Sequence, residues 1–214
     1  MNGLSRRALP LLVALPAAAQ TRLSPLPWDA PEAAPLIARL RAGGLVLFFR
    51  HADTIGQNCD ISFRVGDRAG QRNIAPRGRA QSAAIGQRMA ALGIPVALPV
   101  LAGPVYRARD TAEHMVGAAH VVVTDSLLAD DFSGPRLAWV LDEHRRLFAE
   151  PVAAANRVLV GHRTPAIMLA GEPVGGRAFP EGAALVIAPG GGRDFRVLGI
   201  IEFAPQPGGG FHSC

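Results

Sequence analysis

In the stretch GLVLFFRH, residues 44–51, a run of small, apolar and aromatic residues leads directly into an arginine and a histidine, and this pattern is the clearest indication of the fold. A second stretch, RVLVGH at residues 157–162, also runs from apolar residues into a histidine. Such short runs between glycine- or alanine-rich turns are typical of strands that are buried on both faces of a parallel sheet. The carboxyl ends of these strands form one crevice, so we expect His51 and His162 to reach a common site.

Helical patterns follow both runs, and helices alternate with strands along the chain. We expect helices near residues 33–41, 76–92, 105–116, 135–149 and 165–170, and strands near residues 45–49, 100–102, 120–124, 157–161, 183–188 and 195–203. Gly190, Gly191 and Gly192 fit a hairpin turn between the last two strands. The alternation predicts an α/β fold, namely a three-layer α/β/α sandwich with a mostly parallel central sheet.

The chain of 214 residues has the length of one α/β domain. We place this domain at residues 36–205, between an extended lead-in at residues 20–35 and a flexible Gly-rich tail at residues 206–214. Residues 1–19 have the features of a secretory signal peptide: Arg6 and Arg7 precede an apolar run too short to span a bilayer, and small residues up to Ala19 fit a cleavage site. The sequence therefore predicts an exported, periplasmic protein without a stable membrane span. It leaves the export route open between the general secretory and the twin-arginine systems.

A third stretch, GPVYRARDTA at residues 103–112, predicts the start of a helix near Arg107. Free backbone N–H groups and the helix dipole favour anions there, and an arginine in the first turn strengthens this preference. At the first strand end, the Arg50 guanidinium can hold two oxygens of a phosphoryl group that His51 attacks. The three stretches together favour phosphate chemistry.

These stretches, in their order along the chain, resemble the histidine phosphatase superfamily, in its phosphoglycerate mutase-like branch 1. The matching segments are LVLFFRHADT (45–54), RNIAPRGRAQ (72–81), GPVYRARDTA (103–112) and VLVGH (158–162). The resemblance implies a phosphoglycerate mutase-like fold in which His51 is the nucleophile. It also implies that Arg50, Arg107 and His162 bind the phosphate. Ala52 replaces the usual glycine of the family, and we expect the turn to survive if it needs no positive φ.

The family places an acidic residue between its second arginine and its second histidine, where it protonates the leaving oxygen. The segment LLADDFSG, residues 127–134, resembles the corresponding loop, and Asp130 is the preferred acid. Asp131 and Glu181, in a late turn, remain alternatives. The phytase-like branch is disfavoured because Arg163, and not an aspartate, follows His162; this arginine adds positive charge to the pocket. A helix start that includes Arg77, Gly78, Arg79, Gln81 and Ser82 is predicted as helix surface.

Composition excludes several other classes of function. The net charge of +5 comes from arginine alone, and it falls to +3 once Arg6 and Arg7 leave with the signal peptide. Because the arginines neither cluster nor alternate with aromatic residues, we expect no nucleic-acid partner. No P-loop or Gly-x-Gly-x-x-Gly motif follows the first strand, and no Cys/His spacing fits a metal, so we expect neither cofactor nor metal.

The sequence assigns no catalytic or binding role to the two cysteines or to the other histidines. Cys59 and Cys214 are compatible with a disulfide in an exported protein and equally with free thiols. The other histidines, read as surface or satisfied core groups, are His114, His120, His144 and His212.

The sequence thus predicts a metal-independent phosphatase that hydrolyses a phosphomonoester or a phosphoprotein through a phosphohistidine on His51. A phosphotransferase or mutase on the same scaffold, and a non-catalytic phosphate-binding module, are the alternatives. The substrate, small or macromolecular, and the oligomeric state remain open.

Overall fold

The computed structural model describes residues 22–54, 59–208 and 210–212. Its helices are α1 (Ala34–Ala42), α2 (Pro76–Ala91), α3 (Tyr106–Val116), α4 (Asp130–Ser133), α5 (Leu137–Ala149) and α6 (Arg163–Ala170). Its strands are β1 (Pro25–Pro27), β2 (Val46–Arg50), β3 (Val96–Ala102), β4 (Val121–Val123), β5 (Asn156–Gly161), β6 (Ala183–Gly191) and β7 (Asp194–Glu202). Short 3-10 turns lie at Pro31–Ala33, Ala118–His120, Asp125–Leu127, Gly134–Arg136 and Glu172–Val174.

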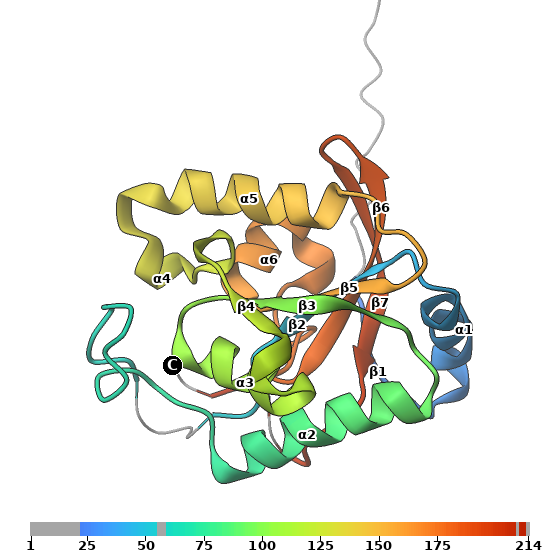
Figure 1. Ribbon diagram of the computed structural model, residues 1–214, viewed down its shortest axis with the longest axis horizontal. Coiled ribbons are helices and arrows are strands. Elements are labelled where there is room, and N and C mark those ends of the chain that lie inside the picture. Colours follow the sequence, from blue (N-terminus) through green and yellow to red (C-terminus); the bar gives the residue numbers. More distant parts are fainter. Residues whose placement is uncertain (1–21, 55–58, 209, 213–214) are drawn as a thin grey trace, which may run out of the picture.

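The strands form one sheet of seven strands in the order β1-β7-β6-β2-β5-β3-β4. β2, β5, β3 and β4 pair in parallel, and β1 pairs in parallel with β7. Only β6 runs against its neighbours, β2 and β7, among the strands described. Helices cover both faces of the sheet, with α2 and α3 below it and α5 and α6 above it in Figure 1. The fold is therefore the expected three-layer α/β/α sandwich with a mostly parallel sheet.

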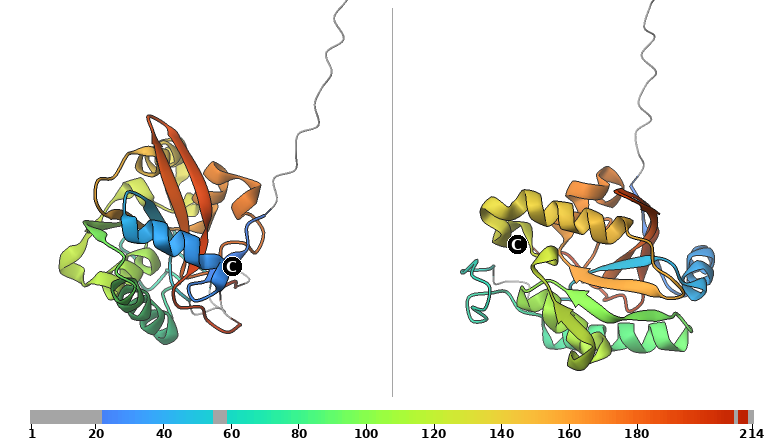
Figure 2. Two further views of the ribbon diagram at one scale, coloured as in Figure 1. Left: turned by 90° about the vertical axis from the view of Figure 1, so that its right-hand side faces the viewer. Right: turned by 45° about the horizontal axis from the view of Figure 1, so that its top comes forward.

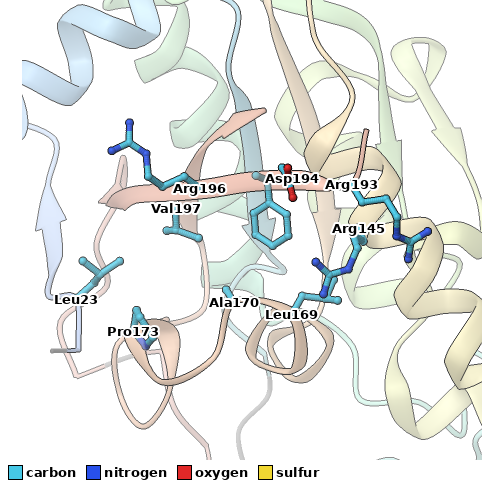
Figure 3. A pocket seen from close by; sticks show the side chains of 10 residues that line it. Leu23, Arg145, Leu169, Ala170, Pro173, Arg193, Asp194, Arg196 and Val197 are labelled. Atoms are coloured by element: carbon cyan, nitrogen blue, oxygen red, sulfur yellow. The ribbon is translucent and has the colours of Figure 1, made fainter. Parts of the chain in front are cut away.

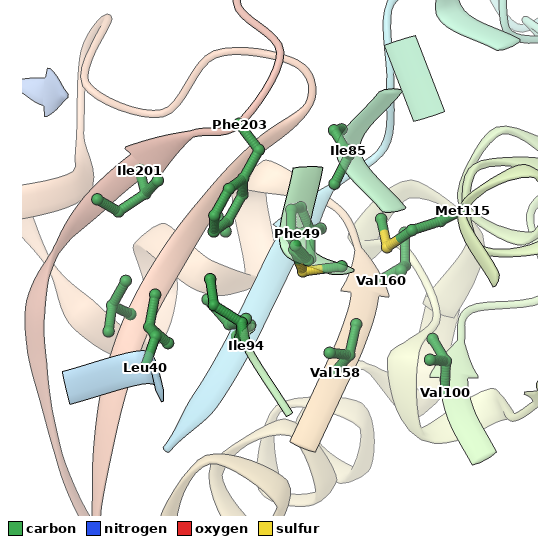
Figure 4. Packing of buried hydrophobic residues seen from close by; sticks show 14 of the residues in the cluster. Leu40, Phe49, Ile85, Ile94, Val100, Met115, Val158, Val160, Ile201 and Phe203 are labelled. Atoms are coloured by element: carbon green, nitrogen blue, oxygen red, sulfur yellow. The ribbon is translucent and has the colours of Figure 1, made fainter. Parts of the chain in front are cut away.

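The alternation of side chains along β2 divides the core into two halves. Val46 and Phe48 pack with residues of α5 and α6, whereas Leu47 and Phe49 pack on the opposite face with α1, α2 and α3. All four are completely buried, as expected for the central strand of a covered parallel sheet. Figure 4 shows Phe49 on the face covered by α1, α2 and α3, where it packs among Leu40 of α1 and side chains from α2, α3 and β7.

The lead-in contributes to the sheet, which the sequence patterns miss. β1 pairs with Ile200–Glu202 of β7, and α1 then crosses the face of β6 and β7, as the left view of Figure 2 shows. β3 begins at Val96, earlier than the predicted residue 100. Pro99 explains the difference, because it has no N–H to donate and the register with β5 shifts between Ala97 and Leu101. In the parts of the chain that the structure describes, no helix has the length and apolar character of a membrane span.

Candidate functional site

Two adjacent parallel strands bring the two predicted histidines together. Arg50 at the end of β2 and Gly161 at the end of β5 are register partners. A histidine follows each of them, and the backbone N–H of His51 donates to the carbonyl of Gly161 at 3.1 Å. The imidazole rings of His51 and His162 lie with centroids 5.5 Å apart, and these residues are only 3% and 4% exposed.

The hydrogen bond of His51 determines which of its ring nitrogens carries the proton. Nδ1 lies 2.9 Å from the carbonyl oxygen of Ala52. Since a carbonyl only accepts, we assign the proton of the neutral ring to Nδ1, which leaves the lone pair on Nε2. Burial, followed by the nearby charges of Arg107 and Arg50, holds the pKa of His51 well below its usual value. Burial, followed by Arg107, His144 and Arg50, holds the pKa of His162 well below its usual value too, so both rings are neutral near pH 7.

Arg107 enters the site from the first turn of α3. It is 5% exposed, and its NH1 donates to Asp60 Oδ1 at 3.0 Å. Nε of Arg107, Nε of Arg50 and Nε2 of His162 are buried without a hydrogen-bond partner among the described residues. Buried nitrogen atoms of this kind are costly to leave unsatisfied. Their convergence around His51 fits a site for an anion.

Arg50 is held by three acceptors from distant parts of the chain. Its NH1 donates to the carbonyls of Phe179 at 3.0 Å and Gly210 at 2.9 Å, and its NH2 donates to Glu181 Oε1 at 3.2 Å. Burial lowers the pKa of Arg50 to about 10, to which the charge of Arg163 contributes. The guanidinium remains charged at neutral pH, and Arg163 adds positive charge beside it as expected.

Glu181 is completely engaged on the inner side of the site. Its carboxylate accepts from the N–H of Thr54 at 3.0 Å and the Thr54 hydroxyl at 3.1 Å, in addition to Arg50. The carboxylate lies 4.0 Å from Nδ1 of His51. This is the ring nitrogen that carries the proton, so Glu181 lies on the side of the imidazole away from the lone pair on Nε2.

Asp130 and Asp131 begin α4 near the other histidine. Asp130 is half-buried and hydrogen-bonded to Thr164, two residues after His162. Burial, followed by the charge of Asp131, raises the pKa of Asp130. A carboxyl with a raised pKa beside the site suits proton donation. The exposed Asp131 lines a pocket of about 240 Å³ together with Cys59, Asp60, Phe63, Arg72 and Arg107.

The start of α2 lies only partly on the surface, which corrects the prediction for three of its residues. Gly78, Gln81 and Ser82 are buried, whereas Arg77 and Arg79 are exposed as predicted. Gln81 accepts from the N–H of Asp53 at 2.9 Å and donates to the carbonyl of Glu181 at 3.2 Å. A Cβ on Gly78 would lie 2.0 Å from the carbonyl oxygen of Asp53, so only glycine allows α2 this close to the loop after His51.

Arg77, from the same turn, binds Asp53. Its Nε and NH2 donate to the two carboxylate oxygens, the second at 2.9 Å. Thr111 of α3 fixes the loop from the other side, because its hydroxyl accepts from the N–H of Ala52 at 2.8 Å. Ala52 keeps the turn without a positive φ, since Ala154 is the one non-glycine residue with positive φ in the described segments.

Sequence reasoning missed His212, which lies against the site from the chain end. Its Nε2 is 3.2 Å from Glu181 Oε2 and 3.4 Å from Asp53 Oδ1. These three residues have the donor atoms of a cation site, with one atom from each within 4.8 Å of the others. Both carboxylates already bind guanidinium groups, of Arg50 and Arg77, and this positive charge opposes a metal ion there. The tail has no composition signal that would have identified His212.

Of the other predicted residues, His114 and His120 are exposed, and His144 is buried with Nδ1 2.9 Å from the Val140 carbonyl. Cys59 is in a disulfide. Cys214, the other cysteine of the sequence, and the predicted signal peptide at residues 1–19 lie outside the described residues.

A larger cavity, of about 520 Å³, lies away from the histidines. Figure 3 shows Arg145 of α5 and Arg193 and Arg196 of the β6–β7 hairpin around it, with Leu169 and Ala170 at the end of α6. Arg193 is paired with Asp142. None of the catalytic candidates lines this cavity, and we do not assign it to the site.

Comparison with known proteins identifies the fold. No model of a known protein family matches the chain, and no curated protein matches it at a significant level. Among solved structures, the protein histidine phosphatase SixA complexed with tungstate matches with a TM-score of 0.51 and 16% identity, over 74% of this chain and 97% of SixA. Two further structures are similar at a lower TM-score. The open reading frame Rv3214 from Mycobacterium tuberculosis matches with a TM-score of 0.49 and 18% identity, over 73% of this chain and 97% of that protein. A mycobacterial glucosyl-3-phosphoglycerate phosphatase matches with a TM-score of 0.47 and 19% identity, over 72% of this chain and 97% of that protein. We base the fold assignment on SixA: the chain shares the fold of this protein histidine phosphatase, which agrees with the fold expected from the sequence motifs.

Proposed function

We propose that this chain, which shares the fold of SixA, is a metal-independent phosphatase that hydrolyses a phosphomonoester or a phosphoprotein through a phosphohistidine on His51. One observation carries the proposal. The neutral ring of His51 has its Nδ1 proton fixed by the Ala52 carbonyl. Arg50, Arg107 and His162 act electrostatically on this ring, and each has a buried nitrogen without a hydrogen-bond partner among the described residues. A nucleophile held beside preorganised positive charge is the arrangement that phosphoryl transfer requires.

In the first step, the lone pair on Nε2 of His51 attacks phosphorus, and the bond from phosphorus to the leaving oxygen breaks. Asp130 gives its proton to that oxygen as it leaves. Arg50 and Arg107 stabilise the negative charge on the equatorial oxygens, where a fixed charge lowers the barrier more than it stabilises bound substrate. His162 faces the same oxygens.

In the second step, water attacks the phosphohistidine and the bond between Nε2 and phosphorus breaks. Asp130, now a carboxylate, takes a proton from this water. The products are inorganic phosphate and a neutral His51. Each group ends in the protonation state in which it began, so no metal or cofactor is needed to balance the cycle.

The decisive experiment compares His51→Ala with His114→Ala on an aryl phosphate. His114 is an exposed histidine of α3, which makes it a matched control. We expect His51→Ala to lower turnover by at least about a thousandfold, because the nucleophile is lost, and His114→Ala to stay within about twofold of the wild type. Near-native turnover by His51→Ala would refute the covalent mechanism. A wild-type chain that binds phosphate and turns nothing over would be a binding module.

We also propose that the protein is exported, with residues 1–19 removed as a signal peptide. Expression of the full chain in a bacterium, fractionation, and N-terminal sequencing test this proposal. A mature protein beginning at Gln20 in the periplasmic fraction supports it. A chain retained in the cytoplasm with Met1 intact contradicts it.

A further inference from the structure

Gly210, near the C-terminus, is hydrogen-bonded directly to residues of the site. The carbonyl oxygen of Gly210 accepts from Arg50 NH1 at 2.9 Å and from the backbone N–H of Glu181 at 3.1 Å. Gly210 is buried, with a φ of +97° that favours glycine. A tail that the sequence assigns to no role therefore supplies one of the three acceptors that orient the Arg50 guanidinium.

The next residue, Phe211, faces three arginines. The guanidinium carbon of Arg50 lies 5.2 Å from the centre of its ring, that of Arg163 5.6 Å, and that of Arg177 4.7 Å. These arginines come from the end of β2, the start of α6 and the loop before β6. The electron-rich face of an aromatic ring attracts cations, and more strongly when they are removed from water.

Like charges crowd this part of the molecule. Arg163, Arg72 and Arg107 each act electrostatically on Arg50 and lower its pKa. Before a phosphate binds, such a cluster repels itself, and the long Arg50 side chain has other rotamers available. The Glu181 carboxylate is a full anion paired with Arg50. The Gly210 carbonyl and the Phe211 ring add partial negative charge at other positions around the same guanidinium.

We propose that Gly210 and Phe211 are positioning residues, and that the C-terminal tail holds Arg50 in the orientation that binds the transferring phosphoryl group. This inference rests on the proposed function. His212 extends the same contact, because its ring lies against the carboxylates of Asp53 and Glu181 behind the nucleophile.

Two glycines of the tail provide a matched pair of variants. A Cβ on Gly210 would lie 2.6 Å from Cβ of Pro180, whereas a Cβ on Gly208 would meet nothing within 4 Å. Both residues have positive φ, of +97° and +65°, so alanine strains the backbone at both. Only Gly210→Ala displaces the tail from Arg50. We expect Gly210→Ala to lower kcat/KM for an aryl phosphate at least about tenfold relative to Gly208→Ala.

Phe211→Leu and Phe211→Tyr separate the aromatic face from simple packing. Leucine fills the space without a ring, and tyrosine keeps the ring over the arginines. We expect Phe211→Leu to lower kcat/KM about tenfold, mainly through kcat because Arg50 acts in the transition state, while Phe211→Tyr stays within about twofold of the wild type. Trp139→Ala is the control, since it removes an exposed ring from over Arg136, away from the tail.

The thermal midpoints of all variants, together with orthophosphate titrations, complete the test. Unchanged midpoints with the losses above support the inference. Equal kcat/KM in Gly210→Ala and Gly208→Ala, or in Phe211→Leu and Phe211→Tyr, overturns it, and a rise in activity would instead make the tail an inhibitor. If the wild type lacks phosphatase activity, the proposed function fails. In that case orthophosphate binding alone tests the role of the tail. Weaker binding by Gly210→Ala than by Gly208→Ala, and by Phe211→Leu than by Phe211→Tyr, supports it, and equal binding overturns it.

Discussion

The imidazole rings of His51 and His162 lie 5.5 Å apart, centre to centre, with their planes inclined by 55°. This distance is a property of the sheet, because β2 and β5 are neighbours in parallel register and each ends one residue before its histidine. Two rigid strands thus place two buried imidazoles side by side. Rigid elements hold reacting groups more closely than loops do.

Arg107 is expected to be far more sensitive to substitution than Arg109. Arg107 is buried beside the histidines, whereas Arg109 is exposed and paired with Glu113 one turn along α3. Arg107→Ala should lower kcat on an aryl phosphate by about a hundredfold or more, because a preorganised donor is lost. Arg109→Ala should change it less than about twofold. Equal losses in the two variants would contradict the assignment of Arg107.

The general acid is expected to be Asp130. Asp130→Asn should slow an alkyl phosphate by about a hundredfold or more and leave an activated aryl phosphate nearly unchanged, because only the alkoxide needs a proton to leave. Glu181→Gln should slow both substrates alike, because Glu181 holds Arg50. A selective loss on the alkyl phosphate in Asp131→Asn or Glu181→Gln would transfer the role to that residue.

Buried histidines should lower the free energy of unfolding at acidic pH. Burial lowers the pKa of His144 from its ordinary value of 6.5 to about 4. As the pH falls, His144 therefore takes up a proton in the unfolded chain at a higher pH than in the folded protein. Its contribution to the free energy of unfolding is complete above pH 6.5 and is lost as the pH falls towards 4. Between pH 7 and pH 5 this loss is about 2 kcal/mol from His144 alone. His51 and His162 act in the same direction.

Urea unfolding at the two pH values measures this loss. His144→Gln keeps a donor for the Val140 carbonyl but has no titrating ring, so its stability should fall less between pH 7 and pH 5. An equally steep fall in this variant would show that His144 does not cause the sensitivity.

Activity is expected to survive chelators and to be inhibited by vanadate. The proposed cycle uses a nitrogen nucleophile and no Lewis acid, and vanadate resembles the five-coordinate phosphoryl group in transfer. Dialysis against a chelator, followed by an assay with and without added divalent cations, checks the first part. Activity that is lost on dialysis and restored by a cation would contradict the metal-independent mechanism, and Asp53, Glu181 and His212 would then be the first described residues to substitute in a search for the metal ligands.

Local sequence patterns were sufficient to predict the two strands that end before His51 and His162 and the helix that carries Arg107. A buried parallel strand has a continuous apolar run, and its end is visible where the charged residue appears, as at Arg50. The same patterns missed β1, because a three-residue strand with two prolines has no periodicity. They also misplaced Gln81 and Ser82 on the surface, because polar residues near a helix start are usually exposed.

The contacts between distant segments could not be predicted from the sequence. Gln81 is buried because it links the loop after His51 to Glu181, and Asp60 is at the site because it binds Arg107. Phe211 and His212 lie in a glycine-rich tail, where composition indicates flexibility. Such contacts depend on how loops fold back over the sheet, which no local pattern records.

Rapid-quench trapping of the phosphoenzyme can show directly whether His51 forms a phosphohistidine. Mixing the wild-type protein with a phosphorus-labelled aryl phosphate and quenching in alkali within the first turnover should leave label on one peptide, attached to His51. This label should be stable to base and lost in acid, as expected for a phosphorus–nitrogen bond, and absent from His51→Ala. Turnover without any trapped label, or with label on a residue other than His51, would contradict the phosphohistidine mechanism.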